Sequence, residues 1–178
     1  DDPESVRKFR NACREAEEFG AGPRGWLTII GPHGSGKTHM AAAIGNRLID
    51  RGHVVFFAHV PDLLDHLRGT FGPSSDVAYS ELFDQVRTTP LLILDGLGSH
   101  STTPWAEEKL RQIINHRYNA ELPTVVTTAS PLDELDELIA SRLRAPGLGQ
   151  VLELRSTTPE QASRLGRIEP QMLQRMTF

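Results

Sequence analysis

GPHGSGKT, residues 31–38, lies between an apolar run and an alanine-rich run, and its position decides how the rest of the chain is interpreted. The octapeptide matches the pattern G-x-x-x-x-G-K-[ST] in full. The preceding run, Trp26 to Ile30, is typical of a buried parallel strand, and the following run, Thr38 to Asp50, predicts a helix. Glycines let such a turn point successive N–H groups at phosphate oxygens. The stretch therefore predicts a nucleotide phosphate site.

Within this loop, we expect Lys37 to reach the β- and γ-phosphates and the Thr38 hydroxyl to ligate Mg²⁺. The helix that begins near Lys37 adds its positive dipole end. A chance match is rare in a chain with only three lysines, Lys8, Lys37 and Lys109. The predicted ATP-binding residues are Gly31, Pro32, His33, Gly34, Ser35, Gly36, Lys37, Thr38 and His39.

Length and composition predict one cytoplasmic domain. The 178 residues can form one core, and we expect a helix and linker over 1–25, the core over 26–155 and a short tail over 156–178. Hydrophobic residues make up 38% and charged residues 24%, which excludes a disordered chain. No apolar run approaches the roughly 20 residues of a membrane span, and no signal-peptide pattern opens the chain. Cys13 is the single cysteine, which excludes an internal disulfide. The net charge of −4 argues against a broadly basic nucleic-acid-binding surface and leaves a local basic strip open.

Apolar runs alternate with helical patterns along the whole core. Further strands are predicted over His53 to Val60, Leu91 to Leu94, Val125 to Thr128 and Val151 to Leu154. Helices are predicted over Pro3 to Phe19, from Pro61, around 81–87, from Thr103-Pro104, and through Leu135, Leu138 and Ile139. Such alternation predicts an α/β fold, a three-layer P-loop NTPase with a five-stranded parallel sheet.

A second acidic motif follows the third predicted strand. Asp95 closes an apolar strand, the Walker B pattern, and is expected to hold Mg²⁺ opposite Thr38. P-loop ATPases that hydrolyse ATP usually place a second carboxylate directly after this Asp. This chain has Gly96 at that position, and glycine offers no base. Hydrolysis is therefore expected to be weak or partner-dependent. Rescue of negligible turnover by Gly96→Glu would mark an ATP-gated switch that has lost its base, whereas brisk turnover in the wild type would mean that another group supplies the base.

The fourth predicted strand raises the same question. Related ATPases place a polar residue here, often Asn, to contact the γ-phosphate, and this chain has Ala129. Thr128 could substitute through its hydroxyl, or Thr127 if the register differs by one residue. The alternative is that both threonines only favour the strand.

An arginine before the fifth strand completes the predicted catalytic set of Lys37, Asp95, Thr128 and Arg142. Such an arginine can project into the ATP site of a neighbouring subunit. We favour Arg142 for this role, with Arg144 second; the alternative is a solvated arginine at a helix end. The assignment predicts an ATP-dependent homo-oligomer.

Together these motifs resemble the AAA+ core of DnaC/DnaI-type helicase loaders and the related IstB-type transposition ATPases, from about Trp26 to Leu154. The segments that carry the resemblance are GPHGSGKTHMAAAIGNRL, VVFFAHVPDLLDHLRGTF, PLLILDGLG, WAEEKLRQIINHRYNAELPTVVTTAS and LIASRL.

The resemblance implies ATP and Mg²⁺ as cofactors, a replicative helicase as partner, a role in DNA replication, and single-stranded DNA along the inner face of a head-to-tail assembly. By that analogy Arg68, and more weakly Arg87, are DNA-contact positions, and a solvated face is the alternative. The tail leaves room for one short helix, so the lid of DnaA-type initiators is expected to be absent or vestigial, which favours a loader. Two other functions stay open: an ATP-gated oligomerising module with essentially no hydrolysis, and an IstB-like transposition helper.

Overall fold

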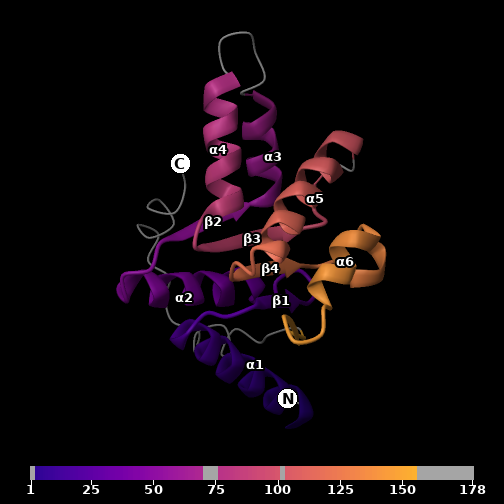
Figure 1. The fold of residues 1–178 in the computed structure, drawn as a ribbon. Helices are drawn as coiled ribbons and strands as arrows, with labels where there is room; N and C mark the ends of the chain where they lie inside the picture. Colours follow the sequence, from indigo (N-terminus) through magenta and orange to yellow (C-terminus); the bar gives the residue numbers. More distant parts are fainter. Residues whose placement is uncertain (1–2, 70–75, 101–102, 156–178) are drawn as a thin grey trace.

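The computed structural model describes residues 3–69, 76–100 and 103–155, so the predicted tail at 156–178 and the polar break at 72–75 lie outside the described residues. Its centre is a five-stranded sheet in the order β2-β3-β4-β1-β5, and every strand pairing is parallel (Figure 1). The strands are β1 (Trp26–Ile30), β2 (Val55–His59), β3 (Leu91–Leu97), β4 (Thr124–Thr128) and β5 (Gly149–Glu153). The predicted five-stranded parallel sheet is confirmed.

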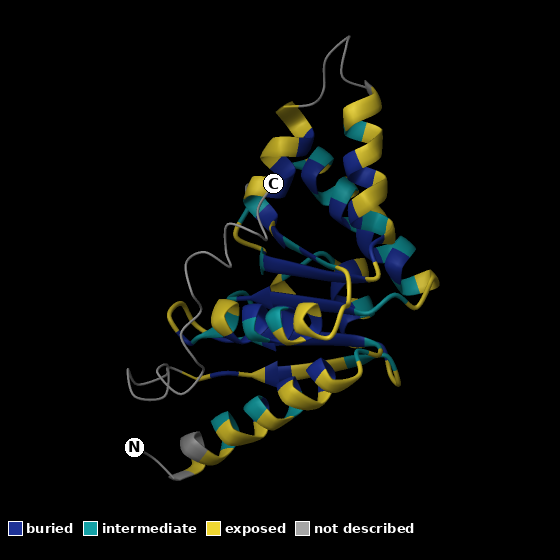
Figure 2. Ribbon diagram, turned by 90° about the vertical axis from the view of Figure 1, so that its left-hand side faces the viewer, coloured by how far each residue is buried: buried dark blue, intermediate teal, exposed yellow. Residues whose placement is uncertain are grey.

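Helices cover both faces of the sheet. One face carries α1 (Pro3–Ala21) and α2 (Lys37–Asp50). The other carries α3 (Val60–Gly69), α4 (Asp76–Thr88), α5 (Pro104–Asn119) and α6 (Glu137–Leu143), with a short 3₁₀ turn, η1 (Leu132–Glu134), before α6. Figure 2 shows the buried strands between these two helical layers. Within the described ranges, no helix combines the length and the apolar character needed to cross a membrane.

The interior strand β3 shows why the apolar runs become buried strands. Leu91 and Ile93 pack into the core under α1 and α2, whereas Leu92 and Leu94 pack into the core under α3 to α6. A strand that is buried on both faces has no polar face to keep, so its sequence reads as a continuous apolar run.

Two of the differences between the predicted and the observed elements change the local geometry. The third strand was predicted to end at Leu94, but β3 continues to Leu97, and its register with β4 shifts between these two residues. The helix predicted through Leu135 is split, because the Asp136 carboxylate caps a new helix by accepting the N–H groups of Leu138 and Ile139. Leu135 is left extended between η1 and α6.

A buried arginine joins α5 to the backbone at the amino ends of β3 and β4. Arg117 is 0% exposed, and its guanidinium donates to the backbone carbonyls of Thr89 and Pro123, at 2.7 Å each, and to the Thr124 hydroxyl at 2.9 Å. Burial lowers the pKa of Arg117 to about 10, so the group stays charged at neutral pH. These hydrogen bonds join the end of α5 to the backbone just before β3 and β4, in keeping with the rule that buried polar groups are paired.

Candidate nucleotide-binding site

A cavity of about 600 Å³ opens at the carboxyl edge of the sheet, beside the turn between β1 and α2. This volume lies within the range of small-molecule sites, about 300–1,000 Å³, and the carboxyl edge is where open α/β sheets bind their ligands. The residues that line it are His33, Gly34, Gly36, Lys37, Thr38, His39, His59, Pro61, Asp95, Gly96, Leu97, Gly98, Ser99, Thr127, Ala129 and Ser130.

The turn before α2 has the form that a phosphate-binding loop requires. Gly36 precedes the helix in the left-handed conformation, with φ 90° and ψ 11°, which side chains other than glycine adopt at a cost. The Lys37 ammonium donates to the Pro32 carbonyl at 2.7 Å. Burial lowers the pKa of Lys37, and the negative charge of Asp95 opposes that shift. A phosphate in the cavity would stabilise this partly desolvated cation.

Three oxygen-bearing side chains from different elements meet at the cavity wall. Thr38 at the start of α2 donates its hydroxyl hydrogen to Asp95 Oδ1 at 2.9 Å, and Thr127 of β4 donates to the same oxygen at 2.7 Å. Asp95 is only 6% exposed. Mg²⁺ prefers oxygen ligands and is commonly held by one or two carboxylates together with substrate phosphates. Asp95 and Thr38 therefore fit the metal that sequence analysis predicts for them.

Gly96 is the residue at the position of the absent second carboxylate. Its φ is +79°, its N–H donates to Thr127 Oγ1 at 2.9 Å, and a Cβ added to it would lie 2.9 Å from Ser99 Oγ and 3.1 Å from the His59 ring. A side chain at this position is both conformationally strained and crowded. Gly96→Glu is therefore a poor way to add a base, because the new side chain would displace Ser99 and His59.

The end of β4 places Thr127, and not Thr128, in the cavity wall. The Thr128 hydroxyl instead hydrogen-bonds with the backbone of Ser130, through its carbonyl at 3.3 Å and its N–H at 3.1 Å. Ala129 lines the cavity without a polar atom in its side chain. Of the two threonines that the sequence left open, Thr127 is the one that contacts Asp95.

Arg142 lies outside the cavity, on α6 against α5. Its guanidinium stacks over the Tyr118 ring, 4.1 Å from the centroid, and donates to Asn115 Oδ1 at 3.2 Å. Arg144, the second choice, is exposed and donates to Asp133 at 2.7 Å. The structure thus keeps Arg142 apart from the nucleotide cavity of its own chain.

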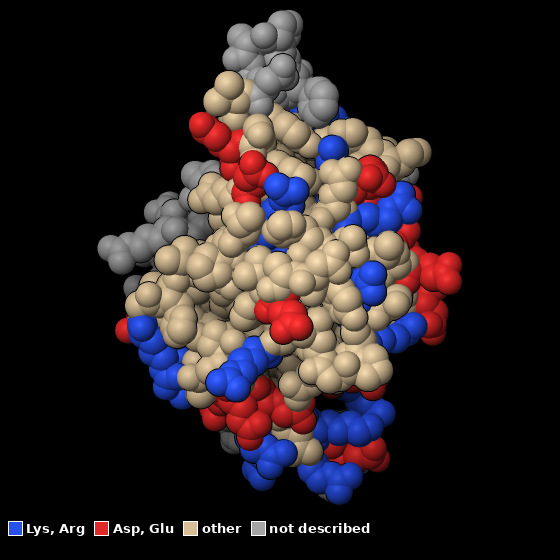
Figure 3. Space-filling view, in the orientation of Figure 1, with Lys and Arg blue, Asp and Glu red and all other residues tan. Residues whose placement is uncertain are grey.

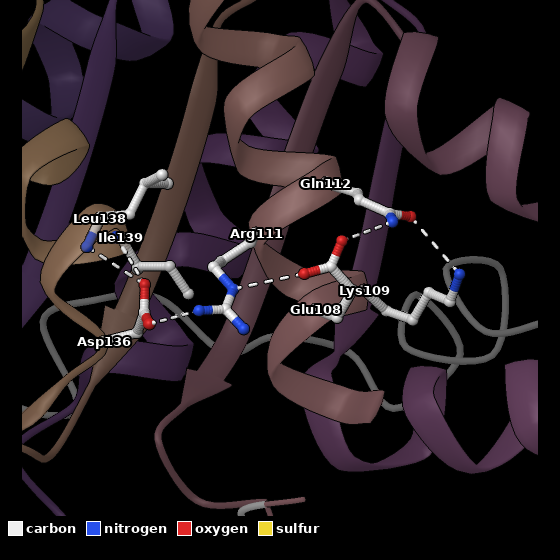
Figure 4. Close-up of polar contacts among 7 residues, drawn as sticks. All are labelled: Glu108, Lys109, Arg111, Gln112, Asp136, Leu138 and Ile139. Atoms are coloured by element: carbon white, nitrogen blue, oxygen red, sulfur yellow. Dashed lines mark hydrogen bonds and ion pairs between the residues drawn. The ribbon is translucent and has the colours of Figure 1, made fainter. Parts of the chain in front are cut away.

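A polar network fixes α6 relative to α5 (Figure 4). Arg111 of α5 donates to Asp136 Oδ2 at 3.2 Å and lies 3.6 Å from Glu108 Oε2. The other oxygen of Asp136 caps α6, and Gln112 donates to the second oxygen of Glu108 at 2.7 Å. The same carboxylate therefore starts the helix that carries Arg142 and fastens it to its neighbour.

Comparison with known proteins places this site in a family. The model of the IstB-like ATP-binding proteins matches residues 24–145, which include the glycine-rich loop, Asp95 and Arg142. The chain belongs to the IstB-like ATP-binding family. Its fold is that of the P-loop AAA+ proteins, and this confirms the resemblance found in the sequence.

Two curated relatives of this IstB-like chain are the replicative helicase loaders DnaI of Bacillus subtilis (strain 168) and DnaC of Escherichia coli (strain K12). DnaI is 30% identical over 75% of this chain and 43% of its own length, and DnaC is 30% identical over 78% of this chain and 56% of its own length. A crystal structure of the DnaC helicase loader has a TM-score of 0.71, with 25% identity, and covers 82% of this chain and 89% of the solved one. The chain spans about half the length of the curated relatives it matches.

The arginines that the resemblance assigns to DNA are held by neighbours in this IstB-like chain. Arg68 lies over the Trp105 ring, 5.2 Å from its centroid, and Arg87 donates to Asp84 at 2.6 Å. Figure 3 shows positive and negative side chains interspersed on one face of the molecule, and both signs gather at its lower end, where α1 lies. That face offers no field of a single sign to attract DNA.

Sequence analysis missed His59, the last residue of β2. It pairs in register with Asp95, and its Nδ1 lies 3.6 Å from Asp95 Oδ2. A polar residue near the end of a predicted apolar strand was the available signal, because the carboxyl ends of parallel strands meet at one edge.

Proposed function

We propose that this chain binds ATP with Mg²⁺ and acts as a DnaC/DnaI-like helicase loader in DNA replication, with weak or partner-dependent hydrolysis. The observation that carries the proposal is the pairing of Thr38 with Asp95 Oδ1 at 2.9 Å in a cavity of about 600 Å³ behind the glycine-rich loop. A phosphate-binding turn and an acidic strand end contact each other there across 57 positions of sequence.

The loop backbone and four side chains of the cavity have defined parts in nucleotide binding. The backbone N–H groups of the loop and of the start of α2 donate hydrogen bonds to phosphate oxygens, and Lys37 adds a cation. Asp95 and Thr38 hold Mg²⁺, which when bound neutralises charge on the phosphates. Thr127 keeps Asp95 oriented through its hydrogen bond to Oδ1.

Arg142 acts on a neighbouring subunit, in an ATP-dependent homo-oligomer. Two observations support this: Arg142 is separate from the cavity of its own chain, and Asp136 fastens the short helix that carries it to α5. To reach a neighbour, the guanidinium leaves Tyr118 and Asn115, contacts worth about 1–2 kcal/mol together.

The relatives' names support the choice of partner, since both curated relatives are replicative helicase loaders. We accordingly propose a replicative helicase and single-stranded DNA as partners, with Arg68 and Arg87 as weak DNA contacts.

A second function is favoured by Gly96 and Ala129, which put no carboxylate or amide where hydrolysing members have one. It is an ATP-gated module that oligomerises on nucleotide with essentially no turnover. An IstB-like transposition helper is a third assignment, consistent with the family.

The test is nucleotide binding followed by helicase loading. Lys37→Ala is expected to weaken ATP binding at least about tenfold, as loss of a charge-assisted phosphate contact of about 1.5–3 kcal/mol predicts. The control is Lys8→Ala, whose exposed lysine pairs with Glu4 on α1. Wild-type protein should then load a replicative helicase on circular single-stranded DNA with ATP, and Lys37→Ala should not. Unchanged ATP affinity in Lys37→Ala would sink the phosphate site, and binding without loading would favour the other two functions.

A further inference from the structure

The wall of the nucleotide cavity beside Gly96 is formed by a histidine from another strand. A Cβ built on Gly96 would lie 3.1 Å from Cε1 and 3.3 Å from Nδ1 of His59. The imidazole thus lies where a side chain at position 96 would begin. Position 96 directly follows Asp95, where the family resemblance implies a carboxylate that faces the attacking water in members that hydrolyse ATP.

His59 is held at that place by the sheet itself. It is the last residue of β2, paired in parallel register with Asp95 of β3. Its side chain is 46% exposed and lines the same cavity as Lys37 and Thr38. The backbone position is therefore rigid, while the ring is open to a molecule in the cavity.

We propose that His59 is a catalytic residue of this chain, the group that hydrogen-bonds the water attacking the γ-phosphate in place of a carboxylate. A neutral imidazole has one acceptor nitrogen and one N–H donor, so it can accept a hydrogen bond from water as a carboxylate does. The inference rests on the proposed ATP binding.

The reaction that the ring assists is ordinary hydrolysis. The water oxygen forms a bond to the γ-phosphorus, and the bond from that phosphorus to the β–γ bridging oxygen breaks, its electron pair leaving with ADP. One water hydrogen stays on the new oxygen and the other passes to a phosphate oxygen, so the product is dihydrogen phosphate. His59 orients the water and keeps no proton.

A purely structural role for His59 predicts something different. Its Nδ1 is 3.6 Å from Asp95 Oδ2, beyond hydrogen-bond distance, and the other oxygen of Asp95 already has Thr38 and Thr127 as donors. If His59 served only to hold Asp95, its loss would weaken binding of nucleotide and Mg²⁺ together. If it holds the water, its loss would lower turnover and leave binding alone.

The experiment measures both quantities on wild type, His59→Ala, His59→Gln and His53→Ala. His53 is the matched control, an exposed histidine before the opposite end of β2. Affinity for Mg²⁺ with the non-hydrolysable analogue AMP-PNP is measured by calorimetry. Turnover of ATP is measured alone and with single-stranded DNA and a replicative helicase, and thermal unfolding checks each fold.

The expected result is a kcat about tenfold or more lower in His59→Ala, since misplacing a reacting group by about 1 Å can cost a hundredfold. AMP-PNP affinity should stay within about twofold, because the phosphate contacts of the loop are untouched. His59→Gln, which keeps an acceptor, should recover part of kcat, and His53→Ala should match wild type.

Three results would overturn the inference: no ATP turnover by wild type under any condition, unchanged kcat in His59→Ala, or AMP-PNP affinity falling in proportion to kcat. In the second and third cases the proposed function survives as long as wild type binds AMP-PNP. The first case would leave ATP binding intact and favour the ATP-gated module with essentially no turnover. Failure of wild type to bind AMP-PNP would instead overturn the proposed function.

Discussion

Thr127 donates its hydroxyl hydrogen to Asp95 Oδ1 at 2.7 Å, and the same hydroxyl oxygen accepts the N–H of Gly96 at 2.9 Å. One buried side chain of β4 thus holds two consecutive residues at the end of β3. This relationship settles the conformation of the acidic strand end before any ligand is present.

Replacing Thr127 by Val is expected to cost about 1–3 kcal/mol of stability, because the buried Asp95 and the Gly96 N–H each lose a partner. It should also weaken Mg²⁺-dependent ATP binding. The control is Thr128→Val, equally buried but bonded to Ser130, which should lose stability without losing ATP affinity. Urea unfolding and calorimetric titration give the two readouts. The opposite pattern, with affinity lost only in Thr128→Val, would restore Thr128 as the residue that contacts the nucleotide.

Gly96→Ala is expected to destabilise the protein more than Gly52→Ala, by about 1 kcal/mol. Both positions have φ near +80°, so both variants bear the left-handed backbone cost of about 1–2 kcal/mol. A Cβ at Gly52 meets no atom within 4 Å, whereas at Gly96 it meets Ser99 and His59. Equal losses of unfolding free energy in the two variants would show that Ser99 and His59 move aside at little cost. Gly96→Glu would then be a reasonable way to add a base.

Arg117→Lys is expected to cost about 2–4 kcal/mol, because a lysine ammonium cannot reach the carbonyl groups and hydroxyl that the guanidinium now satisfies. The control is Arg51→Lys, an exposed arginine that donates to the carbonyls of Gly20 and Ala21 and should change stability by about 0.5 kcal/mol or less. Chemical unfolding measures both. Similar small losses in the two variants would mean that water replaces the missing contacts of Arg117.

If Arg142 acts across subunits, two inactive variants should complement each other. Lys37→Ala has a defective cavity and an intact Arg142, and Arg142→Ala has the reverse. An equal mixture should recover up to about a quarter of wild-type turnover, since half the subunits keep a cavity and half of their head-to-tail neighbours supply the arginine. Arg144→Ala should behave like wild type. A mixture no more active than its components, measured under conditions where wild type turns over, would contradict action in trans.

Cys13 is expected to react slowly with thiol reagents. Burial, and then the charge of Glu17, raise the pKa of its thiol above the ordinary value. A raised pKa leaves less thiolate at a given pH, so the rate of disulfide exchange at pH 8 should fall below that of a free thiol and keep rising past about pH 8.5. Glu17→Gln should raise the rate modestly. A rate equal to that of glutathione would contradict a packed Cys13.

Much of the fold followed from local patterns. Continuous apolar runs predicted the buried strands, and a glycine-rich turn between one strand and one helix predicted the phosphate loop, because both features depend on residues close together in the chain. The split of the predicted helix at Leu135 was missed, since it depends on the side chain of Asp136, which both caps α6 and pairs with Arg111 of α5.

The sequence by itself determined the parallel α/β fold, the phosphate-binding loop and the acidic residue of β3, because each depends on a run of consecutive residues. Only the tertiary structure decided which threonine contacts Asp95, and that a side chain at Gly96 would meet Ser99 and His59. The physical reason is strand register: a shift of one residue turns a side chain to the other face of a sheet, and register is set by packing across the sheet.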